Sequence, residues 1–217
     1  MNPRLSISVF GAPAITIDGA PVRGFVSSKA VALVYYLAAT GRPHTREALA
    51  GLLWGETTET QAQKNLRDVL SNLRRLIEPY VQISRQAVGL APDAFLVDSC
   101  QFEALLEKVD YLPGSAGLAV LRDALALYRG DFLSGVSVAD ASAFEEWALV
   151  ERERLRQLFM DALHRIAVRA AGSRTRRTKT KTRDAGVRLA GFRTRKRETK
   201  TRDAFLFSAA WSYFHLR

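Results

Sequence analysis

Residues 58–79 constrain the fold most, because their apolar and polar side chains separate onto opposite faces of one helix. Apolar side chains recur every three or four residues, the spacing of a helix buried along one stripe: Leu66, Val69, Leu70, Leu73, Leu76 and Ile77. The polar residues of the other face are Lys64, Arg67, Ser71 and Arg74, with Asn65, Asn72 and Arg75 beside them. Pro79 ends the helix, because proline cannot continue it. Such a helix is either a solvated surface helix or one that inserts into a DNA major groove, where Arg, Asn and Ser side chains reach base edges and phosphates.

Two shorter helices and a small sheet are predicted before this helix. Residues 4–26 alternate apolar and polar side chains in two runs with turn signals between them, which indicates an antiparallel sheet. Ser27 or Ser28 can cap a helix over residues 29–40, and Thr45 can open a second helix.

A hairpin is predicted after it. Residues 81–84 and 88–90 form short strand-like runs, joined by Arg85-Gln86-Ala87. Three helices followed by a hairpin, with a small sheet in front, predict a winged helix-turn-helix. In that fold the third helix enters the major groove, and the hairpin tip offers Arg85 to phosphates or to the minor groove.

Residues 99–172 predict a second, all-α domain. Apolar stripes indicate helices over residues 102–109, 117–128 and 141–171, with Pro and Gly residues between them. Such stripes usually form a core. Here they predict repeat-like helical hairpins of the tetratricopeptide kind.

The net charge of +10 comes from the end of the chain. Residues 1–172 hold 18 Lys and Arg against 19 Asp and Glu, whereas residues 173–217 hold 14 against 3. A basic repeat at 174–185 recurs at 193–204 with 9 of 12 positions identical. This composition cannot bury a core, so the tail is predicted to be disordered. It is either a basic arm that strengthens DNA binding at low salt or unrelated repetitive sequence that follows a truncated domain.

Residue usage favours a cytoplasmic protein without a catalytic site. The hydrophobic fraction of 47% and charged fraction of 25% are ordinary for a soluble globular protein. Cys100 is the only cysteine, which favours a reducing compartment, and we interpret it as a packed thiol. No apolar run is long enough to cross a bilayer. The three histidines are far apart and no phosphate-binding glycine loop is present, so we expect no metal, no cofactor and no enzyme activity.

Several spaced motifs resemble one family. They are KAVALVYYLAATGRPHTREALAGLLWGE from Lys29, the NLR and LRR motifs between Asn65 and Ile77, and ISRQAVGLAPDA from Ile83. Together they resemble the OmpR-like winged helix at the amino terminus of SARP-type transcriptional activators. VDSCQFEALL, ALALYRGDFLSG and AFEEWALVERERLRQLF, within residues 95–171, resemble the start of the bacterial transcriptional activation domain that follows it in this family and is roughly twice as long there.

The resemblance implies sequence-specific promoter binding, usually by dimers on direct repeats. It also implies that the helical domain serves dimerisation and contact with RNA polymerase. Asn65, Arg67, Arg74 and Arg75 match the NLR and LRR positions of the family. Asp68 departs from it, because relatives often carry a basic residue after NLR, and a carboxylate either repels phosphate or accepts from a cytosine amine.

The predicted DNA-binding residues lie on the polar helix face, at the starts of the earlier helices and at the hairpin tip. Arg67 and Arg74 are candidates for base or phosphate contacts, with Ser71 between them, while helix starts meet phosphate oxygens. Asn65 is explained equally well by a hydrogen bond within the domain. The full set is Lys29, Thr45, Arg46, Lys64, Asn65, Arg67, Ser71, Arg74, Arg75 and Arg85.

The predicted architecture is an α+β winged helix-turn-helix at residues 1–98, an incomplete all-α tetratricopeptide-like domain at 99–172 and a basic tail at 173–217. The predicted function is a DNA-binding transcriptional regulator of the activator type. Its expected partners are double-stranded DNA, RNA polymerase and a second copy of the chain on DNA. We expect no association with a membrane. The alternative is a truncated protein-interaction or dimerisation module without specific DNA binding, which Asp68 and the truncation favour.

Overall fold

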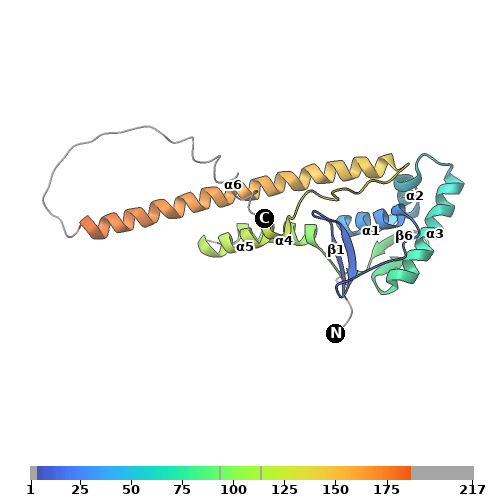
Figure 1. Ribbon diagram of the computed structural model, residues 1–217, viewed down its shortest axis with the longest axis horizontal. Coiled ribbons are helices and arrows are strands. Elements are labelled where there is room, and N and C mark those ends of the chain that lie inside the picture. The colour runs from blue at the N-terminus through green and yellow to red at the C-terminus, as the bar shows by residue number, and fades with distance from the viewer. Residues whose placement is uncertain (1–3, 93, 113, 187–217) are drawn as a thin grey trace. The chain divides into compact units, whose positions relative to one another are not determined.

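The computed structural model describes residues 4–92, 94–112 and 114–186 (Figure 1). The chain divides into two compact units, Met1–Phe159 and Met160–Arg217. The first unit holds both the winged helix and the first helices of the helical region, so the candidate interface lies within it.

The sheet at the amino terminus has four strands, two more than the sequence predicted. β1 (Leu5–Ser8) pairs antiparallel with β2 (Ala14–Ile17), as the two alternating runs predicted. β2 also pairs antiparallel with the short β3 (Ala20–Pro21), which lies outside those runs. β7 (Phe95–Val97) pairs parallel with β1 and completes the order β3-β2-β1-β7. β7 is short, and its partner β1 lies some 90 residues earlier in the sequence, so no local sequence pattern predicts this pairing.

Each of the three helices of the winged helix begins after a capping residue, and the sequence predicted the first two of these caps. α1 (Ser28–Thr40), α2 (Arg46–Trp54) and α3 (Glu59–Ile77) follow Ser27, Thr45 and Thr58, whose hydroxyl oxygens each accept a backbone N–H of the first turn. Each cap satisfies a backbone donor that the helix itself leaves without a partner. Gly41 ends α1 in the left-handed conformation, with φ of 62°.

The wing is a sheet of three short strands. β5 (Val81–Ile83) and β6 (Ala87–Leu90) form the predicted hairpin, and β4 (His44–Thr45) adds to the other edge of β6. Pro79 lies in a short 3-10 turn, η1 (Glu78–Tyr80), between α3 and the hairpin. A side chain at Gly89 would press on Pro43, because an added Cβ would lie 3.2 Å from the proline Cα.

His44 packs inside the winged helix. Its Nε2 lies 2.8 Å from the hydroxyl oxygen of Thr40, and its ring centroid lies 4.7 Å from that of Tyr36. Burial, together with the positive charge of Arg42, lowers the pKa of His44 below its ordinary 6.5. His44 therefore serves the packing of the winged helix.

Acidification through pH 6.5 is expected to destabilise the fold through His44. The unfolded chain protonates this imidazole at its ordinary pKa of 6.5, whereas the folded state resists protonation until a lower pH. Its contribution to the free energy of unfolding is therefore complete above pH 6.5 and is lost as the pH falls toward the lowered folded pKa. Thermal unfolding across a pH series measures this slope. His44→Gln should flatten it, and equal slopes for wild type and His44→Gln would refute the assignment.

The helical region contains α4 (Asp98–Asp110), α5 (Gly114–Leu127) and α6 (Ser142–Gly186). The predicted end of the third helix at Ala171, and the predicted disorder from residue 173, are wrong for residues 172–186, which continue α6. Arg and Lys favour helix, and extending an existing helix avoids the cost of a new nucleus, so a single glycine at 172 does not stop it. The rest of the predicted tail, 187–217, lies outside the described residues.

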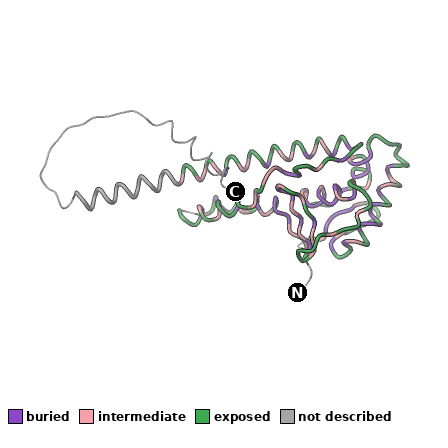
Figure 2. Tube along the Cα trace, in the orientation of Figure 1, coloured by how far each residue is buried: buried purple, intermediate pink, exposed green. Residues whose placement is uncertain are grey.

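Aromatic side chains join the winged helix to the helical region in one core. Phe10, which follows β1, meets Phe102 of α4 edge-on at 5.6 Å between ring centroids. Trp147 of α6 meets Tyr36 of α1 at 4.7 Å. Such rings bury large apolar areas and favour these edge-to-face arrangements. Figure 2 shows the buried residues continuing from the sheets and α1 into α4.

Candidate nucleic-acid interface

α3 has the two faces that the sequence predicted. Its buried residues include all but one of the predicted apolar stripe, and Leu76 is half-buried. The polar face is exposed at Lys64, Arg67, Ser71, Arg74 and Arg75. Packing on one side holds the helix firmly while leaving its arginines free to meet a ligand on the other.

Asn72 does not belong to that polar face. It is 5% exposed, its Nδ2 donates to the Gly24 carbonyl at 3.0 Å, and its Oδ1 accepts the Val26 N–H at 3.2 Å. The placement beside the exposed residues is corrected: the amide holds the segment before α1, satisfying a backbone donor and an acceptor there. Asn65 is half-buried and accepts from Gln61 Nε2 at 2.7 Å, so its amide is engaged within α3.

Asn72→Ala is expected to lower the free energy of unfolding by about 2 kcal/mol, because the Val26 N–H and Gly24 carbonyl would lose their shared partner. Chemical denaturation measures this loss. Asn65→Ala is the control on the same helix and should cost far less, since its amide bonds only to a neighbouring side chain. Equal costs for the two variants would contradict the structural role of Asn72.

Four predicted residues line one hollow. Arg46 comes from the start of α2, Arg67, Ser71 and Arg74 come from α3, and Leu70 and Ile83 complete the wall. The hollow has a volume of about 260 Å³. Guanidinium groups and a hydroxyl converging on one recess form a surface suited to an anionic group such as a backbone phosphate.

The side chains at the start of α2 are tied to the wing. Arg46 donates through Nε and Nη2 to the Ser84 carbonyl at 3.0 and 2.8 Å. The Thr45 hydroxyl oxygen is occupied as the cap of α2, accepting the Ala48 N–H at 3.2 Å. Arg85 lies exposed at the turn between β5 and β6, where the hairpin tip was predicted.

Lys29 is held apart from this hollow. Its ammonium donates to the Asp140 carbonyl at 2.7 Å and lies 5.6 Å from the centroid of the Trp54 ring. The lysine thus links α1 to the loop before α6. Its predicted phosphate contact remains a prediction, and it would require the ammonium to leave these partners.

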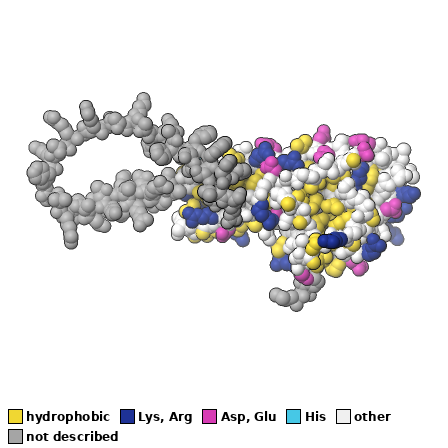
Figure 3. Space-filling model, in the orientation of Figure 1, with side chains coloured by type: hydrophobic (Ala, Val, Ile, Leu, Met, Phe, Trp, Pro, Cys, Tyr) yellow, Lys and Arg dark blue, Asp and Glu magenta, His cyan; other side chains and the backbone are white. Residues whose placement is uncertain are grey.

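Charges of both signs lie around α3. Asp68 is exposed on the helix next to Arg67. Figure 3 shows basic side chains over the part of this face that holds α2 and α3, with acidic ones among them. The local excess of positive charge therefore comes from particular residues on α3 and the wing rather than from a uniformly basic surface.

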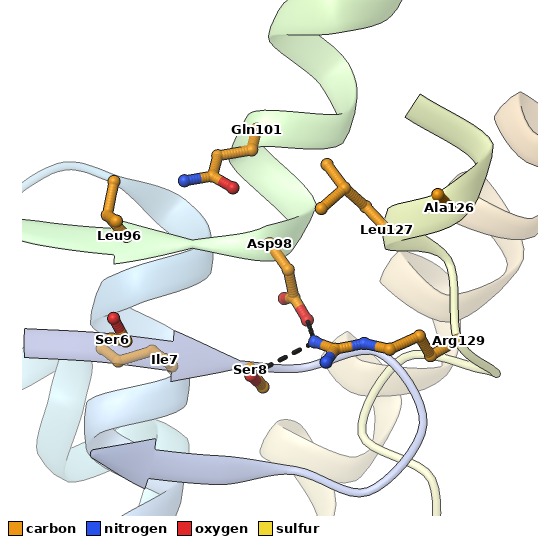
Figure 4. A pocket seen from close by; sticks show the side chains of 9 residues that line it. All are labelled: Ser6, Ile7, Ser8, Leu96, Asp98, Gln101, Ala126, Leu127 and Arg129. Carbon is orange, nitrogen blue, oxygen red and sulfur yellow. Dashed lines mark hydrogen bonds and ion pairs between the residues drawn. The ribbon is translucent and has the colours of Figure 1, made fainter. Parts of the chain in front are cut away.

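Sequence reasoning missed an ion pair between a buried carboxylate and an exposed arginine, which joins the two regions (Figure 4). Asp98, the first residue of α4, is 7% exposed, and its carboxylate accepts the backbone N–H groups of Val9, Phe10 and Ser99. Arg129, which follows α5, donates to the same carboxylate at 3.0 Å and to Ser8 Oγ at 3.3 Å. The N-terminus of α4 adds favourable dipole interaction with the carboxylate.

The chain next to this pair crosses between the regions as well. The Leu133 N–H donates to the Val9 carbonyl at 2.8 Å, and the Gly11 N–H donates to the Asp131 carbonyl at 3.2 Å. A side chain at Gly11 would strike the Arg129 carbonyl, because an added Cβ would lie 2.9 Å from that oxygen. The winged helix and the start of the helical region are therefore bonded through backbone as well as side chains.

Other kinds of site find little support in the described part of the chain. It contains no group of three or more His, Cys, Asp and Glu residues able to hold a metal ion. None of its helices is long and apolar enough to cross a membrane. Cys100 is exposed, which corrects its interpretation as a packed thiol.

The comparison with protein families decides what the helical region is. The model described as "Bacterial transcriptional activator domain" matches residues 97–183. Residues 97–183 belong to that family. The match begins at the last residue of β7 and takes in α4, α5 and most of α6, so it confirms the resemblance to the SARP-type activators. No curated protein matches the chain.

A solved structure supports the order of the two folds. The structure of Mycobacterium tuberculosis EmbR in complex with low affinity phosphopeptide is similar to this chain, with a TM-score of 0.58 and 23% identity. The likeness covers 85% of this chain and 52% of that one, so this chain spans about half the length of that protein. Together with the family match, it confirms the fold class: an α+β winged helix followed by a tetratricopeptide-like all-α region.

Proposed function

We propose that this SARP-type chain is a sequence-specific DNA-binding regulator that activates promoters carrying direct repeats. The observation that carries the proposal is the hollow in which Arg67, Ser71 and Arg74 of the exposed α3 face meet Arg46. The activator-domain match supports a role in transcription. We expect the winged helix to occupy residues 1–98 and the helical effector region residues 99–172.

α3 would enter the major groove with its exposed face toward the bases. Arg67 and Arg74 lie seven residues apart, so they are separated by about 10 Å along the helix. That separation lets the two guanidinium groups address different base pairs or a base and a phosphate, with Ser71 between them. Lys64 and Arg75 flank this row and would contact phosphates.

Affinity and specificity would come from different groups. Neutralising phosphates supplies most of the affinity and makes it salt-dependent, whereas contacts to base edges supply the preference for one sequence. Arg85 at the wing tip would contact a phosphate or the minor groove. Asp68 would disfavour phosphate beside Arg67 and accept from a cytosine amine, which gives it a selective rather than an attractive role.

The helical region would serve the remaining partners. We propose that it supports dimerisation on the DNA and contact with RNA polymerase, in the cytoplasm. Basic residues beyond residue 173 would add a sequence-independent attraction to DNA that weakens as salt rises.

Selection from a randomised duplex library by the full chain tests this function. The expected result is enrichment of a short motif present twice in the same orientation. A single enriched motif without a repeat would retain specific binding and reject the dimer on direct repeats. Recovery of duplexes with no common sequence would overturn the proposed function.

A protein-interaction module is the second candidate, and the carboxylate of Asp68 on the exposed face of α3 favours it. Such a module would associate with itself or with a related activator without selecting a DNA sequence. Asp68→Arg separates the two candidates. If the protein is a DNA-binding regulator, the variant should change its affinity for DNA or its sequence preference, while self-association measured by sedimentation stays the same. If it is an interaction module, DNA sequence preference should be absent in both the wild type and the variant.

A further inference from the structure

Arg46 is the arginine of the hollow whose guanidinium is already bound within the fold. Its Nε and Nη2 both donate to the carbonyl of Ser84, at 3.0 and 2.8 Å. Its backbone N–H donates to the carbonyl of Gln86 at 3.2 Å. The first residue of α2 is thus bonded to both sides of Arg85, the residue at the hairpin tip.

The turn that carries Arg85 is itself closed by Ser84. The Ser84 hydroxyl oxygen accepts the N–H of Ala87 at 2.9 Å and that of Gln86 at 3.3 Å. The Ser84 N–H donates to the Ala87 carbonyl at 2.9 Å. A turn closed in this way moves as one piece, so whatever holds the Ser84 carbonyl sets the direction of the whole tip.

The pairing of β4 with β6 alone would fix the orientation of the hairpin tip only weakly. β4 contributes only His44 and Thr45 to the sheet, paired with Val88 and Ala87. The guanidinium fork of Arg46 adds two donors to one carbonyl beyond the last of these pairs. A planar fork holds direction better than a single flexible ammonium does.

We propose that Arg46 is a positioning residue that fixes the wing tip, and Arg85 with it, relative to α3. The inference rests on the proposed function, because it concerns how the wing and α3 reach the same DNA. Arg46 lines the hollow together with Arg67 and Arg74 of α3 and Ile83 of the wing, so it lies next to both elements that it would align. The contacts that the wing makes to bases or phosphates would therefore depend on Arg46, a residue of α2.

A double-mutant cycle in the full chain tests the coupling, using a duplex obtained from the library selection. Arg46→Ala should weaken binding about tenfold in the wild-type background. In the Arg85→Ala background it should weaken binding less than about twofold, because the tip no longer has a contact to misplace. The full tenfold loss in both backgrounds would make Arg46 an independent phosphate contact and overturn the proposal.

Conservative and matched variants complete that cycle. Arg46→Lys keeps the charge but loses the fork, so the salt slope of binding should match wild type while the coupling to Arg85 is mostly lost. Arg42→Ala removes a charge from an exposed residue at the turn before β4 and should act independently of Arg85. If Arg46→Lys restored the full coupling, charge rather than the fork would be responsible, and the positioning role would be wrong.

Amide hydrogen exchange tests the same inference without DNA. In Arg46→Ala the amides of Gln86 and Ala87 should exchange about tenfold faster, while those of α1 stay protected. Unchanged exchange at the turn would overturn the positioning role even if DNA binding weakened. If the wild-type chain selects no DNA sequence, the proposed function fails, and the exchange experiment still decides whether Arg46 holds the wing.

Discussion

Replacing Arg67 and Arg74 together by alanine is expected to remove the preference of this protein for its selected DNA sequence. Each bidentate arginine contact to a base discriminates by about 1–3 kcal/mol, so the pair should weaken specific binding by roughly a hundredfold. The side chains are exposed, and their loss removes little from the core. Titration by fluorescence anisotropy against the selected duplex and a scrambled duplex measures both affinity and preference.

A second double variant that also loses two positive charges controls for the general electrostatic attraction to DNA. Arg23 and Arg122 are exposed and lie off the α3 face, on the segment before α1 and on α5. Replacing both by alanine should weaken binding to selected and scrambled duplexes to the same small extent. If the Arg67 and Arg74 variant behaved like this control, α3 would not be the reading element.

Asp98→Ala is expected to be the most destabilising single change considered. It would leave the buried N–H groups of Val9 and Phe10 without their acceptor and release Arg129 from its carboxylate. The expected loss in free energy of unfolding is about 3 kcal/mol. Chemical denaturation measures it. The midpoint should fall for probes in both regions together, because Asp98 joins them.

Two further variants separate the parts of that effect. Arg129→Ala should cost less than Asp98→Ala, since Asp98 would keep its three backbone donors and Arg129 is 58% exposed. Glu107→Ala removes an exposed carboxylate from the same helix and should leave stability nearly unchanged. Similar costs for Asp98→Ala and Glu107→Ala would contradict the structural role of the buried carboxylate.

Local patterns were enough to predict most of the winged helix. The apolar stripe of α3, the capping residues of α1 and α2 and the hairpin around Arg85 depend on neighbours within a few residues in sequence. The candidate residues followed from the polar face of α3, the starts of the earlier helices and the hairpin tip. The hollow that gathers Arg46 with Arg67 and Arg74 agrees with that face.

Contacts between distant residues were not predictable in the same way. Asp98 bonds to residues 88 and 89 positions earlier, and β7 pairs with β1, which no helical or strand period encodes. Asn72 looks like a surface amide in sequence because a buried asparagine differs from an exposed one only in its partners. The continuation of α6 past Gly172 reflects the preceding helix, which overrides the composition of the segment.

The central claim is that α3 and the wing read DNA sequence, and a salt series on the full chain tests it most directly. The measurement compares affinity for the library-selected duplex with affinity for a scrambled duplex of the same length and composition. Our account predicts that both affinities fall as salt rises while the ratio between them persists, because base contacts are screened less than phosphate contacts. Equal affinities that fall together steeply with salt would show that only basic charge binds DNA and would contradict the account.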